Sequence, residues 1–290
     1  MNRRIRDALL AAVVAPAAAV LSWSPSAAAA TVLIAEGVAQ QRGSAQQAFN
    51  GGFCVQNSCR SISTGPLDVK TSSQQIQTAV NGTPGDIIVM GYSLGAAATY
   101  DRMRQWDRNP GSAPDPERVV LIVTFGNPEN KFGGDSRTDP GTGLPPNQPY
   151  QHLDVTMQYD SVADKPTRWG FYSMINASFA RHFAYFEDVD IDDPDNLIYQ
   201  ENGTTYMLIP ADVLPMLQWR AAFTSPQRMA ELDAQYPPLV ERDYDRPAYV
   251  PQGEGADWGA GNPPPAVPAV GEDGGRESPV GRHRREERSS

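Results

Sequence analysis

The chain has few of the residues that build metal, redox or nucleic-acid sites. Its 290 residues include two cysteines and three histidines, and 34 acidic side chains outnumber 24 basic ones. Nucleic acid is excluded as a partner, because binding to its phosphates needs a surplus of lysine and arginine. We find no phosphate-binding loop, dinucleotide motif or metal-ligand cluster, so we expect no cofactor and no metal. A hydrophobic content of 40% excludes an unstructured polymer, and the lack of several long apolar runs excludes a membrane transporter.

The amino-acid composition of both ends of the chain differs from that of its middle. Residues 1–30 contain early arginines, then an apolar stretch, then a run of small residues that ends at Ala30. This layout predicts a secretory signal peptide cleaved near Ala30, and hence a secreted or envelope-associated protein; an uncleaved anchor is the alternative. Residues 247–290 are rich in proline, glycine and charge, which predicts a disordered tail. The remaining residues, 31–246, have the size of one domain.

The two cysteines, Cys54 and Cys59, lie close together in a glycine-rich stretch. Their spacing is not that of a Cys-x-x-Cys motif and no histidine is near, so zinc binding and redox chemistry are not indicated. In an oxidising compartment such a pair is expected to form one disulfide.

Short apolar runs alternate with helical stretches along residues 31–246. The runs are continuous and rich in β-branched residues, as in strands that are buried on both faces of a parallel sheet. They lie at 31–35, 86–90, 119–125 and 154–159, with helical stretches at 72–80 and 96–106. This order predicts an α/β domain. Asn202-Gly203 lies between two further short runs and predicts a hairpin.

The most informative segment is Gly91-Tyr92-Ser93-Leu94-Gly95, a Gly-x-Ser-x-Gly motif between a strand-like run and an alanine-rich helix. This context is that of a nucleophile elbow, whose tight turn leaves no room for a side chain at either glycine. We therefore predict Ser93 as the nucleophile, with the backbone N–H of Leu94 stabilising an oxyanion. The alternative is a plain glycine-rich turn.

Three histidines are available as the base that a serine hydroxyl needs. His283 lies in the predicted tail. His152 precedes the fourth apolar run and so lies at the amino end of that strand, whereas the sites of α/β sheets form at the carboxyl ends. His182 follows the strand and is our candidate base; a structural histidine is the alternative interpretation.

The orienting acid is expected at the carboxyl end of a strand and before the histidine in sequence. Asp160 lies at the end of the fourth run, and Asp164 follows in the same loop. We choose Asp160 and keep Asp164 as the alternative acid. The order Ser93, Asp160, His182 is that of α/β-hydrolases, so we predict an α/β-hydrolase fold with a mostly parallel sheet and helices on both faces.

Three surrounding features are predicted from position alone. The second oxyanion donor is expected in the loop after the first strand, and we choose the N–H of Val38. The segment 133–151, rich in proline and glycine, is a candidate cover over the site. The aromatic stretch 169–175 is either the lining of an acyl pocket or a surface packed on the sheet.

Several blocks of the sequence resemble the PE-PPE domain of mycobacteria, a family related to cutinases. The resemblance covers residues 31–246 and is strongest from Asp86 onward; its main blocks are Phe125–Gly134, Tyr159–Pro166 and Tyr206–Pro210. Asp160–Val162 and His182–Tyr185 are similar to the cutinase Asp-x-Val and His-x-x-Tyr blocks, which favours Asp160 over Asp164. The loop after the first strand, Glu36–Val38, departs from the Gly-Thr expected there.

The resemblance implies a secreted serine esterase or lipase that cleaves acyl esters through an acyl-serine intermediate. The first alternative is an acyltransferase that moves fatty acyl chains onto trehalose-type glycolipids of the cell envelope, and the second is a non-catalytic envelope binding protein. The expected partner is an acyl-ester or glycolipid substrate, with peripheral contact to lipid or the cell envelope. Because a signal peptide stands where family members carry a PE or PPE segment, we expect a stand-alone form with a different export route.

Overall fold

The computed structural model describes residues 29–62, 67–179 and 181–265, and these form an eight-stranded sheet. The strands are β1 (Thr31–Ala35), β2 (Ser58–Ser61), β3 (Ile87–Tyr92), β4 (Val119–Phe125), β5 (His152–Met157), β6 (Leu197–Glu201), β7 (Thr204–Ile209) and β8 (Val250–Pro251). Their order across the sheet is β2-β1-β3-β4-β5-β7-β6-β8. Strands β1 to β5 and β7 run parallel, and β6 pairs antiparallel with β7 and β8.

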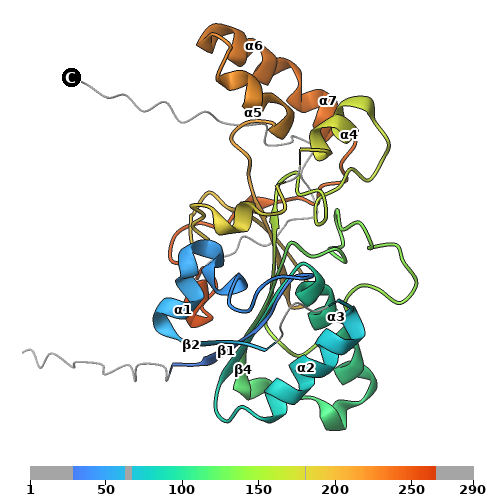
Figure 1. Ribbon diagram of the computed structural model, residues 1–290, viewed down its shortest axis with the longest axis vertical. Coiled ribbons are helices and arrows are strands. Elements are labelled where there is room, and N and C mark those ends of the chain that lie inside the picture. The colour runs from blue at the N-terminus through green and yellow to red at the C-terminus, as the bar shows by residue number, and fades with distance from the viewer. Residues whose placement is uncertain (1–28, 63–66, 180, 266–290) are drawn as a thin grey trace, which may run out of the picture.

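Helices cover both faces of this sheet, as Figure 1 shows. Helix α1 lies on one face, and α2 and α3 lie on the other. The helices are α1 (Gly52–Gln56), α2 (Val69–Asn81), α3 (Leu94–Arg108), α4 (Phe171–Ala177), α5 (Pro215–Ala221), α6 (Pro226–Gln235) and α7 (Pro237–Glu241); short 3-10 helices are η1 (Ala45–Gly51), η2 (Pro110–Ser112), η3 (Pro116–Arg118), η4 (Ala184–Phe186) and η5 (Trp258–Ala260). The predicted fold class, an α/β-hydrolase fold with a mostly parallel sheet between helices, is confirmed.

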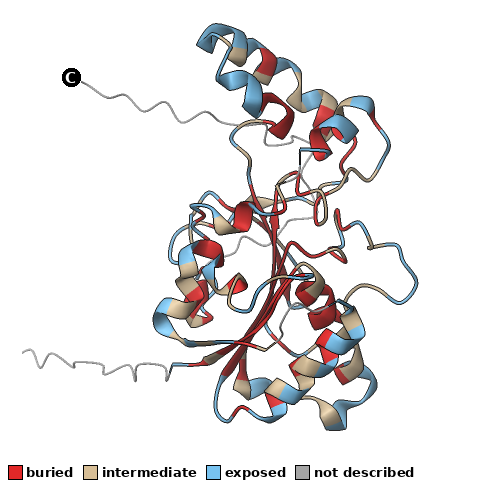
Figure 2. Cartoon of the chain, in the orientation of Figure 1, coloured by how far each residue is buried: buried red, intermediate tan, exposed pale blue. Residues whose placement is uncertain are grey.

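The core has two halves because the side chains of a strand alternate between the faces of the sheet. All residues of β3 are buried; Ile88 and Met90 pack into the cluster on the α1 face, whereas Ile87 and Val89 pack against α2 and α3. The buried residues follow the strands through the middle of the molecule in Figure 2. Burial on both faces explains why these runs are continuously apolar rather than alternating.

Helices α4 to α7 form a separate group beyond one end of the sheet (Figure 1). Helices α5, α6 and α7 each begin at a proline, which suits the first turn of a helix because its missing N–H would have no partner there. Their buried side chains form a cluster of their own, in which Leu214, Leu217 and Val240 pack with Tyr159, the residue two positions beyond β5. The cluster thus attaches the helical group to the carboxyl end of β5.

The tail predicted from residue 247 is wrong over its first part. Strand β8 adds to the edge of β6, and Trp258 is fully buried and donates its Nε1–H to Gln252 Oε1 at 3.1 Å. The segment therefore completes the core on the α1 face, and the folded domain extends beyond Arg246 to residue 265. The remainder of the predicted tail, 266–290, lies outside the described residues.

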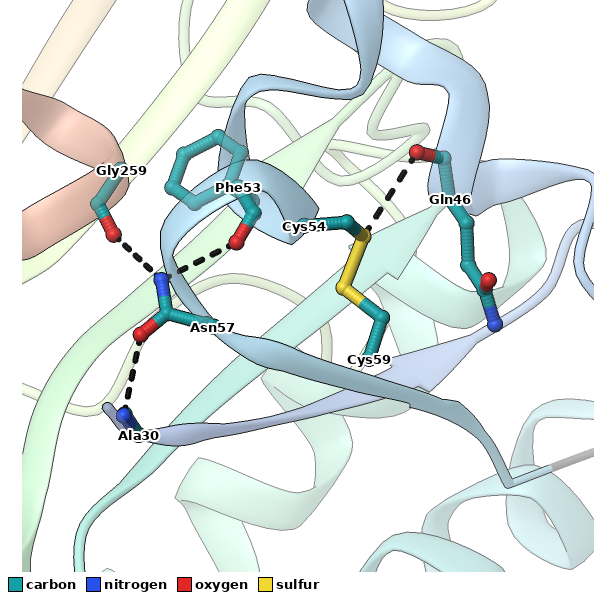
Figure 3. Close-up of a disulfide and its surroundings, with 7 residues drawn as sticks. All are labelled: Ala30, Gln46, Phe53, Cys54, Asn57, Cys59 and Gly259. Atoms are coloured by element: carbon teal, nitrogen blue, oxygen red, sulfur yellow. Dashed lines mark hydrogen bonds between the residues drawn. A yellow bond between two sulfur atoms is a disulfide. The ribbon is translucent and has the colours of Figure 1, made fainter.

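A disulfide joins Cys54 and Cys59, as Figure 3 shows. Between them, Asn57 donates its amide to the carbonyl of Gly259 and accepts from the N–H of Ala30, so this loop ties the start of β1 to the segment around Trp258. Ala30 is itself buried.

The predicted signal peptide otherwise falls on residues 1–28, outside the described residues, and cleavage near Ala30 stays a prediction.

The candidate cover, residues 133–151, is hydrogen-bonded to the body of the domain. The N–H of Lys165 donates to the carbonyl of Gly133 at 2.7 Å, and the carbonyl of Gly143 accepts from Arg104 of α3 at 2.7 Å. The N–H of Gly143 also donates to Glu129 at 2.8 Å. The segment therefore contacts the loop that follows β5 at Gly133 and helix α3 at Gly143, and its role as a cover over the site stays a prediction.

Candidate active site

Ser93 occupies a sharp turn between β3 and α3. Its backbone has φ +52° and ψ −114°, a conformation that few non-glycine residues adopt. A side chain at Gly91 would lie 2.5 Å from the carbonyl oxygen of Gly95, and one at Gly95 would lie 2.1 Å from the carbonyl oxygen of Ala35. Because backbone atoms stand at both places, only glycine fits, and the predicted elbow geometry of this motif is present.

The structure brings Ser93, His182 and Asp160 together in one chain of hydrogen bonds. His182 Nε2 lies 2.9 Å from Ser93 Oγ, and His182 Nδ1 lies 2.9 and 3.0 Å from the two carboxylate oxygens of Asp160. Asp160 is fully buried, and His182 is nearly so. Ser93 follows β3 and Asp160 follows β5, so the group sits at the carboxyl ends of parallel strands, where sites of α/β sheets form.

This arrangement suits nucleophilic catalysis. With its Nδ1–H donated to Asp160, the imidazole leaves Nε2 free to take the proton of the Ser93 hydroxyl. Leu94 is the first residue of α3, and the N–H groups in the first turn of a helix have no acceptor within the helix. An anion that forms beside Ser93 would therefore meet backbone donors and the positive end of the helix dipole.

Two tyrosines hold the acid and the base, and neither is foreseen from the sequence. The Tyr185 hydroxyl donates to Asp160 Oδ2 at 2.7 Å and accepts from the N–H of Met157 at 3.1 Å. Burial, together with the charge of Asp160, raises the pKa of Tyr185 well above its ordinary value, so its hydroxyl stays a donor. The Tyr92 ring stacks on the His182 ring, and its hydroxyl donates to the His182 carbonyl at 2.7 Å. Tyr185 lies three residues after His182, which is the only signal in the sequence for its role.

The alternative acid, Asp164, is placed elsewhere. It accepts from the N–H of Tyr159 at 2.7 Å and forms a buried ion pair with Arg246, which also pairs with Glu241. Burial raises the pKa of Asp164, while the charge of Arg246 opposes that shift. Asp164 therefore links the loop after β5 to the chain that returns from α7, and Asp160 is the carboxylate that accepts the hydrogen bond from His182.

His152 lies at the opposite end of the sheet, as its place in the sequence predicts. It is the first residue of β5, fully buried, with Nε2 at 2.9 Å from Thr124 Oγ1 and Nδ1 at 3.1 Å from Thr204 Oγ1. Burial lowers its pKa from 6.5 to about 3, so it is neutral at physiological pH. It is a structural histidine of the sheet.

The loop after β1 approaches the elbow, since Gly95 packs directly against the Ala35 carbonyl. Val38 lies in this loop and is 56% exposed, and the choice of its N–H as second oxyanion donor stays a prediction. Glu36 is fully buried and accepts from the N–H groups of Gly43 and Ala45. Its carboxylate thus holds the loop after β1 to the backbone of residues 43–45. Within the described ranges no cluster of ligand-type side chains suits a metal ion.

The aromatic stretch before His182 lies at the surface. Helix α4 packs on α5 and α7 through small and polar residues such as Ser173 and Asn176, and exposes Phe171 and Met174. Packing of this stretch on the sheet, one of the two interpretations, is therefore not observed. Phe183, next to the base, is 67% exposed. In the part of the chain that the structure describes, no helix has the length and apolarity needed to span a bilayer.

A known protein family matches most of this chain. The chain matches the PE-PPE domain over residues 55–245. It is 26% identical over 210 residues to Esterase PE16 of Mycobacterium tuberculosis (strain ATCC 25618 / H37Rv), an alignment that covers 66% of this chain and 39% of that protein. It is 32% identical over 154 residues to PE family protein PE3 of the same organism, covering 46% of this chain and 32% of that one. Among solved structures, a cutinase-like protein from Cryptococcus sp. is 18% identical, with a TM-score of 0.44 and coverage of 55% of this chain and 87% of that one.

The fold and the geometry around Ser93 define a domain of the α/β-hydrolase class. Because the family match spans more than half of its length, the chain belongs to the PE-PPE domain family. It spans 39% and 32% of the length of the two curated relatives.

Proposed function

We propose that this protein is a secreted serine esterase that cleaves carboxylic acyl esters through an acyl-Ser93 intermediate. The observation that carries the proposal is the hydrogen-bonded chain from Ser93 Oγ through His182 to Asp160, with distances of 2.9 to 3.0 Å. The family match supports it, as does the name of the relative Esterase PE16, which points to esters as the substrate class.

The reaction has two halves with the same residues. His182 Nε2 takes the Ser93 proton as Oγ attacks the ester carbonyl, and the N–H groups of Leu94 and Val38 stabilise the resulting oxyanion. The intermediate collapses as His182 returns the proton to the leaving alcohol, which leaves an acyl-Ser93 ester. Water, deprotonated by His182, then attacks this ester and releases the acid. Asp160 stays ionised and holds the imidazolium in place.

Acyl transfer is the second candidate, because a sugar or lipid hydroxyl can replace water in the second half. Exposed apolar side chains close to the base in sequence, among them Phe179 and Phe183, support it because they offer an apolar surface to a lipid acceptor. They also support peripheral contact with lipid or the cell envelope. A non-catalytic binding protein is disfavoured, because such a protein has no need of an intact Ser-His-Asp chain.

The test is hydrolysis of a p-nitrophenyl acyl ester by the protein and by Ser93→Ala. We expect the variant to lose at least about a thousandfold in kcat, while the free energy of unfolding changes by less than about 0.5 kcal/mol. The matched control is Ser178→Ala, an exposed serine of the α4 end, which should keep full activity. Turnover retained by Ser93→Ala would contradict the proposal. Adding trehalose to the wild-type reaction separates the two candidates: an acyl-trehalose product assigns acyl transfer, and free acid alone assigns hydrolysis.

A further inference from the structure

The exposed large apolar side chains of this protein gather in two segments of the chain. Among the described residues eleven such side chains are exposed, and eight of them lie in residues 169–183 and 219–223. The first segment contains six of them: Trp169, Phe171, Met174, Ile175, Phe179 and Phe183. Single apolar side chains at a surface need no explanation, whereas a group of this kind marks a place of contact with a partner or with lipid.

Helix α4, in the first segment, turns its apolar side outward. Phe171, Met174 and Ile175 are three and four residues apart, so they lie on one side of the helix, and all three are exposed. Ser173 and Asn176 are buried on the other side, where they are hydrogen-bonded to the residue two positions after α7 and to the start of α5. A helix that contributed to the core would have the reverse pattern. The outward side of α4 is therefore built for contact with something other than this domain.

Helix α5 packs on α4 and carries the second group. Trp219 and Phe223 are four residues apart and are 56% and 87% exposed. Arg220, between them, is exposed too, and its guanidinium lies over the Trp219 ring at 5.1 Å. Among the described residues it has no carboxylate within ion-pair distance, whereas Arg228, further along, pairs with Glu231 at 2.6 Å. Arg220 is thus a cation without a counter-charge beside exposed aromatic rings.

The charge of both segments suits a negatively charged partner. Acidic side chains outnumber basic ones by 34 to 24 in the chain, but residues 165–186 and 213–230 contain none. Aromatic side chains are favoured at the level of lipid headgroups, and an arginine binds phosphate oxygens through two parallel hydrogen bonds. Exposed aromatic rings with an arginine and no carboxylate therefore complement the headgroups of anionic lipids.

The position of this surface relates it to the catalytic site. Figure 1 shows that α4 to α7 project beyond one end of the sheet, which presents α4 and α5 to a flat surface. This group is attached at the carboxyl end of β5, the end where Asp160 lies and where β3 leads to Ser93. The exposed ring of Phe183, a few residues after α4, lies 5.7 Å from the ring of His182. An apolar side chain thus reaches the base itself.

From these observations we propose that α4 and α5 form the surface by which this protein docks on an anionic lipid bilayer. The exposed side chains of α4, with Trp219 and Phe223, enter the headgroup region, and Arg220 pairs with a lipid phosphate. This surface gives the peripheral lipid contact of the proposed function a location. It rests on that function only for its purpose, which is to hold Ser93 close to acyl-ester lipids.

Tryptophan emission reports directly on this surface. Of the five tryptophans, Trp106 and Trp258 are buried, Trp169 and Trp219 are exposed, and Trp23 lies outside the described residues. The full chain with Trp23→Phe is mixed with vesicles of phosphatidylcholine and phosphatidylglycerol whose acyl chains carry bromine, a quencher. We expect up to roughly half of the emission to be lost, because two of the four remaining rings reach the lipid. Further replacement of Trp169 and Trp219 by phenylalanine should remove the quenching.

Two single variants, made in the same chain, test the two parts of the surface. Arg220→Gln should weaken vesicle binding about fivefold, since one cation near the headgroups is lost. Trp219→Ser should weaken it about tenfold, since one aromatic ring no longer leaves water. The matched controls are Arg108→Gln, an exposed arginine in the last turn of α3, and Val55→Ser, an 81% exposed valine of α1. Both controls should bind as the parent chain does.

Four outcomes would overturn the proposal. They are no quenching of the parent chain, quenching that persists without Trp169 and Trp219, equal binding to pure phosphatidylcholine vesicles, and controls that bind as weakly as Arg220→Gln. A dimer in solution that Trp219→Ser dissociates would also contradict it, by assigning the surface to a second copy of the chain. Because the readout is binding, Ser93→Ala should bind vesicles unchanged, and a failed esterase assay leaves this test unaffected. Failure to dock leaves hydrolysis of a soluble ester equally untouched.

Discussion

At the scale of single residues, the site depends on side chains that never touch substrate. Asp160 is fully buried, and its carboxylate would be poorly solvated without the donors around it. Two of these are the Nδ1–H of His182 and the hydroxyl of Tyr185. The N–H of Val162 also donates to Asp160 Oδ1, at 2.8 Å. Tyr185 is thus a positioning residue, acting through Asp160 on the base.

Replacing Tyr185 by phenylalanine should lower kcat about tenfold with little change in KM. One charge-assisted hydrogen bond to Asp160 is lost, while the ring keeps its packing against Phe49 and Phe125. Steady-state ester hydrolysis measures the split between kcat and KM. Tyr172→Phe, on α4 and outside the site, is the control and should behave as wild type. An unchanged kcat for Tyr185→Phe would show that Asp160 is held without it.

The three site residues could be predicted from the sequence because each carries a local signal. Ser93 lies in a five-residue motif, Asp160 lies at the end of an apolar run, and His182 has two competitors at most. Tyr92 and Tyr185 could not be assigned, because their roles follow from how distant segments approach in the folded chain. For Val38, the sequence predicts only that the second oxyanion donor lies in the loop after β1. The shape of that loop depends on the buried Glu36.

At the scale of elements, strands that are buried on both faces of the sheet are the ones that the sequence predicts best. The apolar runs at β1, β3, β4 and β5 are predicted to within two residues at each end, because burial on both faces demands such runs. Strand β2 is missed, since its sequence Ser58–Ser61 contains no apolar run and pairs only at the edge of the sheet. Strand β8 and Trp258 are missed because proline and glycine dominate their surroundings.

Gly95→Ala should abolish ester cleavage and lower the free energy of unfolding by about 3 kcal/mol. Its new methyl group would lie 2.1 Å from the carbonyl oxygen of Ala35, so β1 or α3 has to shift. Urea unfolding followed by circular dichroism measures the loss. Gly52→Ala, whose methyl group would meet nothing within 4 Å, is the control and should be nearly neutral. Equal stability of the two variants would contradict the tight elbow.

At the scale of the whole molecule, buried titratable groups in the sheet link stability to pH. Burial lowers the pKa of His152 from 6.5 to about 3 and raises that of Asp154 from 3.8 to about 6, although hydrogen bonds from Tyr100, Asn127 and Asn130 oppose the second shift. Between pH 6.5 and 3 the folded state binds fewer protons at His152 than the unfolded state does. His152 therefore lowers stability as the pH falls through that window. Asp154 has the opposite effect: it raises stability as the pH falls from 6 to 3.8, because the folded state binds more protons there.

The His152→Gln variant should isolate the histidine from the other groups. Glutamine can still bond to Thr124 and Thr204 but does not titrate. Relative to the wild type, the variant should gain about 1.4 kcal/mol of unfolding free energy for each pH unit below 6.5. Urea titrations between pH 7 and pH 4 measure it. Parallel pH profiles for the two proteins would show that His152 can be protonated within the fold.

The central claim is that Ser93 is an activated nucleophile, and covalent labelling tests it most directly. The protein is exposed to a fluorophosphonate ester probe and then digested, and the modified peptide is identified by mass spectrometry. We predict one adduct, on Ser93, and its loss in His182→Ala, because the hydroxyl needs the base at 2.9 Å from its oxygen. Folded protein that remains unlabelled at Ser93, or labelled equally without His182, would contradict the account.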